Sequence, residues 1–214
     1  MEMEKERGIS ISSTVMNFDY NKLRINILDT PGHEDFSEDT YRSLAAADNA
    51  VMLLDAAKGL EPQTRKLFEV CRMRKLPLFT FVNKMDRQGS DFLGVCRQVI
   101  EKLGSKAVPI VLNIGDEEDF KGIVDLVKNQ AIVWHDENYG STFDIVDIPN
   151  DLKDEAEKLR GELIEAVAEY DENILEKYFD DPDSITEDEI HNALRAATQD
   201  ISIIPMVCGS AFKN

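Results

Sequence analysis

The sequence has no apolar stretch of the roughly 20 residues that a membrane span requires. Residues 1–7 are mostly charged and have no apolar core, so they do not resemble a signal peptide. Cysteine is scarce and odd in number, and Cys71, Cys96 and Cys208 are far apart, which argues against disulfides and a structural metal site. With 214 residues, 43% of them hydrophobic, the chain fits a globular protein that we expect to be cytoplasmic and to have no membrane partner.

Positive charge is scarce in the second half of the chain. The net charge is -18, yet residues 1–104 carry 16 acidic and 15 basic side chains, whereas residues 105–214 carry 26 and 9. Binding to phosphate backbones needs Lys and Arg, so we expect no sequence-specific contact with nucleic acid. The acidic region either attracts a basic protein or only keeps the chain in solution, and composition alone favours the second interpretation.

Apolar runs alternate with helical patterns over most of the chain. This alternation predicts an α/β fold, a mostly parallel sheet flanked by helices. Polar motifs follow three of the runs, and the carboxyl edge of such a sheet is where ligands bind. The predicted strands are residues 23–29, 49–55, 77–83 and 203–207, and the predicted helices are residues 38–46, 62–74 and 91–103.

Residues 105–199 break this alternation. Four β-like runs come first, and two or three helices follow. One helix carries an apolar stripe from Leu152 to Tyr170, and Thr186 with Glu189 has the spacing of a capping box. We therefore predict an acidic α+β lobe at residues 105–199, inserted in a domain formed by residues 1–104 and 200–214. The β-like runs are residues 108–114, 122–127, 131–134 and 143–148.

The most specific motif is Asn83-Lys84-Met85-Asp86. The Asp86 carboxylate can accept from both N–H groups on the N1 and N2 edge of guanine, a bidentate geometry that strengthens a charged hydrogen bond. Adenine lacks this pair of donors, so a buried Asp86 would reject it. Asn83 can brace the loop, and the stem of Lys84 can cover the face of the ring. The alternative is a strand end with ordinary polar residues.

Asp29-Thr30-Pro31-Gly32-His33 is a weaker signal, because Asp-x-x-Gly is a common turn. After an apolar strand, Asp29 can hold a water bound to Mg²⁺, and the Gly32 amide can meet a γ-phosphate. His33 can position the attacking water, or it is a solvated histidine at the start of a helix. We expect all five residues to contribute to nucleotide binding, with Gly32 and His33 in the catalytic role.

Ser210-Ala211-Phe212 follows the last predicted strand. Its backbone amides can donate to O6 of guanine. By itself the string says little, because Gly-Ser-Ala is common in loops, and it gains weight as the third motif in this order.

Residues 6–12, Glu-Arg-Gly-Ile-Ser-Ile-Ser, followed by Asp-Thr-Pro-Gly-His, resemble the end of the first switch and the next motif of translational GTPases. That family has a Thr at the position of Ser10 that reaches Mg²⁺, so the resemblance implies that Ser10 is a Mg²⁺ ligand, with Asp29 acting through water. The further matches divide between two families. Residues 86–92, 109–114, 120–126, 176–179 and 208–214 resemble bacterial elongation factor G, and residues 34–42 and 69–74 resemble peptide-chain release factor three.

The insertion favours elongation factor G. That resemblance implies a ribosome-associated factor that binds GTP, GDP and Mg²⁺ and hydrolyses GTP to drive translocation, with the ribosomal stalk protein docking on the acidic lobe. Two alternatives stay open. One is a GTPase like release factor three, which recycles class I release factors, and the other is a non-hydrolysing module that docks on the ribosome or its stalk.

The phosphate-binding pattern Gly-x-x-x-x-Gly-Lys-Ser/Thr does not occur in this sequence. Gly89 and Gly94 have the glycine spacing, but Val95 and Cys96 follow them. In the related family this loop and the first strand precede the first switch. We therefore expect the given chain to be a fragment that keeps the guanine-specifying loops but by itself binds GTP weakly and does not hydrolyse it.

Overall fold

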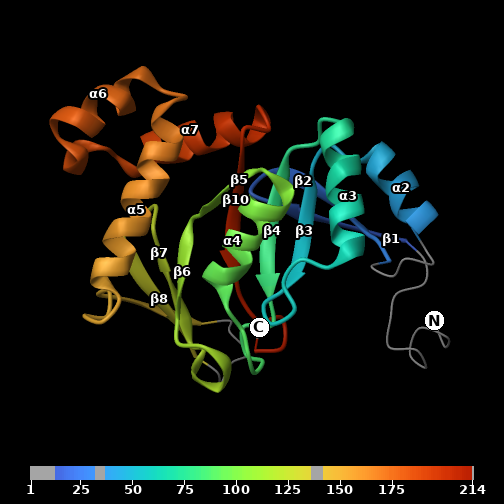
Figure 1. Cartoon of the computed structure of the whole chain (residues 1–214), viewed down its shortest axis with the longest axis horizontal. Helices are drawn as coiled ribbons and strands as arrows, with labels where there is room; N and C mark the ends of the chain where they lie inside the picture. The colour runs from blue at the N-terminus through green and yellow to red at the C-terminus, as the bar shows by residue number, and fades with distance from the viewer. Residues whose placement is uncertain (1–12, 32–36, 136–141, 214) are drawn as a thin grey trace. The chain divides into compact units, whose positions relative to one another are not determined.

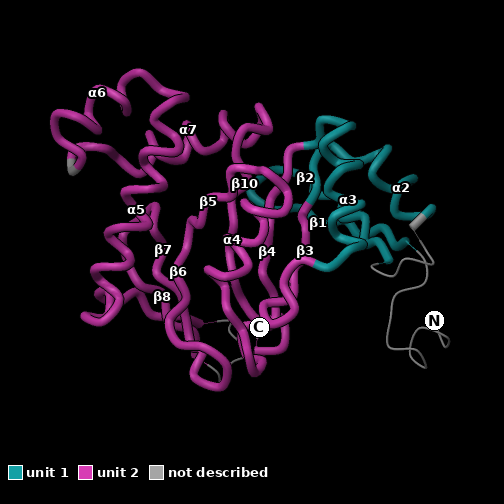
Figure 2. The backbone as a smooth tube through the Cα atoms, viewed as in Figure 1, with its two compact units in different colours: residues 1–50, 61–76 teal, residues 51–60, 77–214 magenta. Residues whose placement is uncertain are grey.

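The computed structural model describes residues 13–31, 37–135 and 142–213. The chain forms two compact units, residues 1–50 with 61–76 and residues 51–60 with 77–214 (Figure 2). In the described ranges, none of the helices is both long and apolar enough to cross a membrane.

The first unit contains a two-stranded antiparallel hairpin, β1 (Thr14–Tyr20) and β2 (Leu23–Asp29). The predicted strand at residues 23–29 is confirmed, whereas the sequence did not indicate β1. Asn21 and Lys22 join the strands with φ of 46° and 65°, the left-handed backbone that tight two-residue hairpin turns require. The strand before the Asp29 motif therefore pairs in a hairpin and is outside the four-stranded parallel sheet.

The described part of the first unit also contains the helices α2 (Ser37–Ala46) and α3 (Pro62–Met73), close to the predicted ranges. A proline at the first position opens α3, where its missing N–H costs nothing. The end of α3 turns back on itself, since the Leu76 amide donates to the Cys71 carbonyl at 3.0 Å.

The second unit contains the sheet that the alternating pattern predicts. Its order is β3-β4-β10-β5, and β10 is paired in parallel with both β4 and β5 (Figure 1). Helix α4 contacts β5, α5 contacts β5, and α7 contacts β10, so helices flank this sheet and the predicted fold class is confirmed. The strands are β3 (Ala50–Asp55), β4 (Leu78–Asn83), β5 (Lys106–Pro109) and β10 (Ile203–Cys208), and α4 is Phe92–Leu103.

The predicted run at residues 108–114 is divided between two sheets. Its first part is the end of β5 in the parallel sheet, and the rest is β6 (Val111–Ile114). Ile110 stands between them, with its amide donating to Met206 of β10 at 3.0 Å and its carbonyl accepting from Leu126 at 3.1 Å. The parallel sheet therefore includes a strand from the region expected to be lobe.

The described part of the second unit also contains an antiparallel sheet of order β6-β7-β8-β9 and the helices α5, α6 and α7. Figure 1 shows these helices grouped together, from orange to red. Arg160 ties α5 to the turn between β7 and β8 by donating to the carbonyls of Leu126 and Val127. The elements are β7 (Gly122–Asp125), β8 (Gln130–Trp134), β9 (Phe143–Val146), α5 (Lys153–Ala168), α6 (Glu172–Asp180) and α7 (Glu187–Gln199).

Helix α5 has the two faces that its sequence predicts. Leu159, Leu163 and Val167 are buried in one continuous core, which also includes Val108 of β5 and Ile203 of β10. On the other face Glu162, Glu165 and Glu169 are exposed. This core therefore joins the lobe to two strands of the parallel sheet, and α5 presents an acidic surface.

The predicted capping box opens α7. The Thr186 hydroxyl accepts from the Glu189 amide at 3.4 Å, and the Glu189 carboxylate accepts from the Thr186 amide at 2.8 Å. Lys177 of α6 donates to the same carboxylate at 2.6 Å, and together these contacts lower the pKa of Glu189 to about 2. The cap therefore also joins α6 to α7.

We predict that Thr186→Ala lowers the free energy of unfolding by about 1 kcal/mol, because it removes a capping hydroxyl. Urea denaturation measures the change. Thr198→Ala is the matched control, since its hydroxyl bonds only to the Leu194 carbonyl inside α7 and its loss should cost less than about 0.5 kcal/mol. Equal losses in the two variants would contradict the capping role.

Candidate guanine-nucleotide site

The first motif lies in the first unit, at the end of β2. Asp29 is the last residue of that strand and is exposed. Pro31 is buried, and its carbonyl accepts from the Thr40 hydroxyl at 3.0 Å. Ser10, Gly32 and His33 lie outside the described residues, so their assigned roles stay predictions.

The second and third motifs come together in the second unit, at the carboxyl ends of the adjacent strands β4 and β10. The Asn83 side-chain oxygen accepts from the Ala211 amide at 2.9 Å and from the Lys84 amide at 2.8 Å. The Ser210 hydroxyl donates to the Asp86 carboxylate. Two side chains therefore link the motifs, and the predicted brace by Asn83 is present.

The backbone draws the same two loops together. The Met85 amide donates to the Gly209 carbonyl at 3.1 Å, and the Gly209 amide donates to the Val82 carbonyl at 3.0 Å. A Cβ on Gly209 would come within 2.7 Å of the Phe81 ring, so this close approach requires glycine. Met85, fully buried beside Asp86, anchors the loop in the core.

Ser210 has a role that the sequence did not indicate. Its side chain is buried, and its hydroxyl oxygen accepts from the amides of Phe212 at 3.3 Å and Lys213 at 3.1 Å while it donates to Asp86. The hydroxyl thus shapes its own loop and orients the carboxylate. The Ala211 amide, expected to face guanine O6, donates to Asn83 in this structure, and Phe212 is 89% exposed.

Lys84 is held by Asp55, an acid that lies outside the three sequence motifs. Its ammonium lies 2.7 Å from Asp55 Oδ2, at the end of β3, while Asp55 Oδ1 accepts from the amides of Ala57 at 3.0 Å and Lys58 at 3.1 Å. Burial raises the pKa of Asp55, but the hydrogen bonds from Lys84 and these amides outweigh it and hold the pKa below its usual value. The only hint in the sequence was an acid at the end of an apolar strand.

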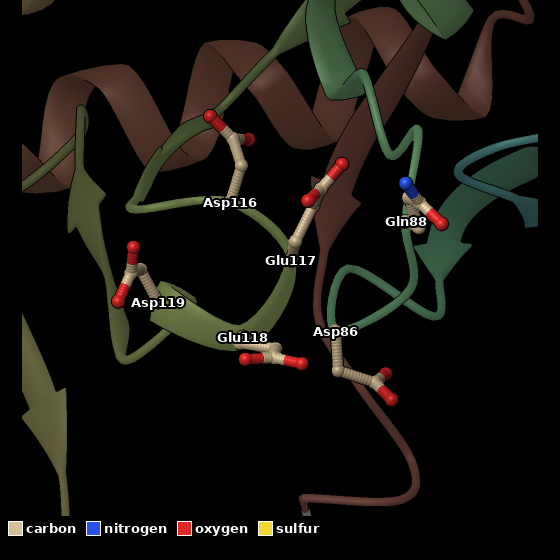
Figure 3. Close-up of a pocket in the computed structure, with 6 residues that line it drawn as sticks. All are labelled: Asp86, Gln88, Asp116, Glu117, Glu118 and Asp119. Carbon is tan, nitrogen blue, oxygen red and sulfur yellow. The ribbon is translucent and has the colours of Figure 1, made fainter.

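A cavity of about 450 Å³ lies beside Asp86 (Figure 3). One wall is the loop after β4, and the other is the turn between β6 and β7. Burial is the main cause that raises the pKa of Asp116 in this wall. The described segments contain no cluster of His, Cys, Asp and Glu suited to a metal ion. The lining residues are Asp86, Gln88, Asp116, Glu117, Glu118 and Asp119.

Removing the Asp55 carboxylate should destabilise the second unit. Asp55→Ala loses the acceptor for two amides and for Lys84, and should lower the free energy of unfolding by about 1–3 kcal/mol. Asp55→Asn keeps an oxygen for the amides and should lose less. Urea denaturation of both variants at neutral pH checks this order.

The pH dependence gives a second readout of the same pair. The folded pKa of Asp55 lies below its usual value of 3.8, so the stabilisation is complete above that pH and is lost as the pH falls through the folded pKa. The difference between wild type and Asp55→Asn should therefore shrink in acid. A constant difference from pH 7 to pH 2 would contradict the ionised pair.

Comparison with known proteins identifies the family of this chain. The model of the elongation factor Tu GTP binding domain matches residues 1–214. Elongation factor G of Cytophaga hutchinsonii is 51% identical over 218 residues, covering 100% of this chain and 31% of that protein. Elongation factor G of Amoebophilus asiaticus is 45% identical over 227 residues, covering 100% and 32%.

The chain thus spans about a third of the length of these curated relatives. A crystal structure of a Thermus thermophilus protein aligns with a TM-score of 0.87 at 24% identity, covering 100% of this chain and 31% of that one, which shows a shared fold. With a family model matched over its whole length, the chain belongs to the elongation factor Tu GTP-binding domain family, and it is similar in sequence to part of elongation factor G.

Proposed function

We propose that this chain is the guanine-nucleotide-binding part of a ribosome-associated translation factor that hydrolyses GTP to drive translocation in the cytoplasm. The observation that carries the proposal is the pair of side-chain links, Asn83 to Ala211 and Ser210 to Asp86, between two loops more than 120 residues apart. These links bring the Asp86 carboxylate, which can accept from two donors of guanine, beside the loop after β10.

In this proposal Asp86 recognises the N1 and N2 donors of guanine. Ser210 occupies one oxygen of the carboxylate, which fixes the plane of the group and orients the other oxygen. The aliphatic stem of Lys84 covers the base, and its pairing with Asp55 limits where the stem can lie. Hydrogen-bond donors and acceptors of this kind fit a guanine nucleotide, GTP or GDP.

The phosphate and metal chemistry belongs in this proposal to the first motif. Ser10 and, through water, Asp29 offer the hydroxyl and carboxylate oxygens that suit Mg²⁺. Thr30, Pro31 and Gly32 follow Asp29 in the nucleotide-binding motif, and we assign to the Gly32 amide the contact with the γ-phosphate. His33 positions the attacking water. Mg²⁺, when bound, would neutralise phosphate charge.

We also propose a division into a GTP-binding domain, residues 1–104 and 200–214, and an acidic lobe, residues 105–199. Residues 106–109 of β5 are the exception to these bounds. The pairing of β5 with β10 supports counting them with the sheet of the GTP-binding domain. The exposed acids of α5 support a basic protein, the ribosomal stalk protein, as the partner of the lobe.

A release-factor-recycling GTPase is the second candidate. Residues 34–42 and 69–74 favour it, while the relatives with high identity over the whole chain favour the translocase. A ribosome assay that scores translocation against recycling of class I release factors, using the protein that contains this chain, separates the two.

Asp86→Asn tests base recognition. Asparagine offers one donor and one acceptor, which match the N1 donor and O2 acceptor of xanthine and mismatch the two donors of guanine. GDP affinity should fall by at least about tenfold, since a charged hydrogen bond is lost, and XDP affinity should rise. Competition binding with GDP, XDP and ADP measures this. Unchanged preference for GDP would refute the role of Asp86.

The partner surface has its own test. Reversing Glu162 and Glu165 to Lys should weaken stalk-protein binding by about tenfold or more at low salt, with a smaller change at high salt. The matched control reverses Glu101 and Glu69, which are exposed acids outside the lobe. Equal affinity of the lobe variant and wild type would exclude this face.

A further inference from the structure

A single turn of the lobe contacts both loops that we assign to guanine. It comprises residues 115–120, between β6 and β7, and includes a short 3-10 helix, Glu117–Asp119. Figure 3 shows Glu117 and Glu118 beside the loop that carries Asp86 and Gln88. None of the sequence motifs pointed to this turn.

On one side the turn holds the backbone around Asp86. The Glu117 amide donates to the Met85 carbonyl at 2.9 Å, and Glu117 Oε1 accepts from the Gly89 amide at 2.7 Å. The Ser90 hydroxyl donates to the same Met85 carbonyl at 2.9 Å. The amide and the side chain of Glu117 therefore hold Met85, which precedes Asp86, and Gly89, which follows it.

On the other side the turn holds the loop after β10. The Lys213 ammonium donates to the carbonyls of Glu118 at 2.8 Å and Phe120 at 2.9 Å. The Lys213 amide donates to the hydroxyl oxygen of Ser210, which in turn donates to Asp86. The same turn thus reaches Asp86 through both of its neighbouring loops.

The turn itself has a restricted shape. Gly115 has φ of 75°, and a Cβ there would lie 2.1 Å from the Asp119 carbonyl oxygen. Asn113 donates to the Gly115 carbonyl at 3.1 Å and to the Asp116 carboxylate at 2.8 Å. Phe120 is buried at the end of the turn. Because both ends of the turn are fixed, the turn can set the spacing between the loops after β4 and β10.

We propose that residues 115–120 hold the two guanine loops in register, and that Glu117 and Lys213 are positioning residues for base selectivity. This inference rests on the proposed function, in which Asp86 accepts from both N1 and N2 of guanine. A bidentate contact depends on orientation more than a single hydrogen bond does, so loosening either loop should weaken the N2 contact first.

Hypoxanthine reports on that contact, because it keeps the N1 donor of guanine and lacks the 2-amino group. The ¹⁵N-labelled chain is titrated with GDP, IDP and ADP, and dissociation constants are taken from amide NMR shifts. Glu117→Ala and Lys213→Met should each reduce the ratio of GDP to IDP affinity by about three- to tenfold, the equivalent of one hydrogen bond. Glu117→Gln and Lys213→Arg keep an acceptor or a donor and should restore the ratio.

Glu157→Ala is the control, since Glu157 is exposed on α5 and belongs neither to the turn nor to the lining of the cavity beside Asp86. It should leave the ratio unchanged. The unfolding midpoints of all variants show whether a change in the affinity ratio comes from positioning or from lost stability. If Glu117→Ala does not fold, Lys213→Met tests the positioning role of residues 115–120 from the loop after β10.

Three results have different meanings. A lower unfolding midpoint with an unchanged GDP to IDP ratio would overturn the positioning role and leave the proposed function standing. A wild-type chain that binds GDP no more tightly than ADP would overturn the proposed function and the positioning role with it. A reduced ratio that the conservative variants restore would support both.

Discussion

The hydrogen bond from the Ala211 amide to the Asn83 side chain is the contact on which the arrangement of the site depends. It joins residues 128 positions apart at the carboxyl ends of two parallel strands, β4 and β10. The buried Ser210 adds the link to Asp86 beside it. A single hydrogen bond contributes only about 1 kcal/mol net, but separating the loops would also leave the buried Ser210 hydroxyl without its acceptor on Asp86, which costs more.

Most elements of the fold could be predicted from hydrophobic periodicity. The buried runs of β4 and β10 and the stripe of α5 have the patterns that burial on two faces or one face produces. Strand β1 was missed because it is exposed along its whole length, so no face of it had to be apolar. The sequence did not indicate that the run at residues 108–114 divides at Ile110, because hydrophobic periodicity does not show which strand a segment pairs with.

The site could be predicted as far as the ends of the strands could be predicted. Parallel strands bring their carboxyl ends to one edge, so the motifs at residues 83–86 and 210–212 were expected to meet, and they do. The supporting residues were not predictable, because their partners are distant in the chain. Asp55 meets Lys84 across 29 positions and Glu117 meets Gly89 across 28, and no local pattern encodes such pairs.

The packing of the lobe explains why its turn can act on the loops. Val108 of β5 and Ile203 of β10 lie in the same buried cluster as Leu163 of α5 and Ile190 of α7, so the lobe and the parallel sheet share one core. Close-packed interiors deform little. The contacts of Glu117 and Lys213 therefore connect a firmly packed lobe to the loops beside the carboxylate assigned to guanine.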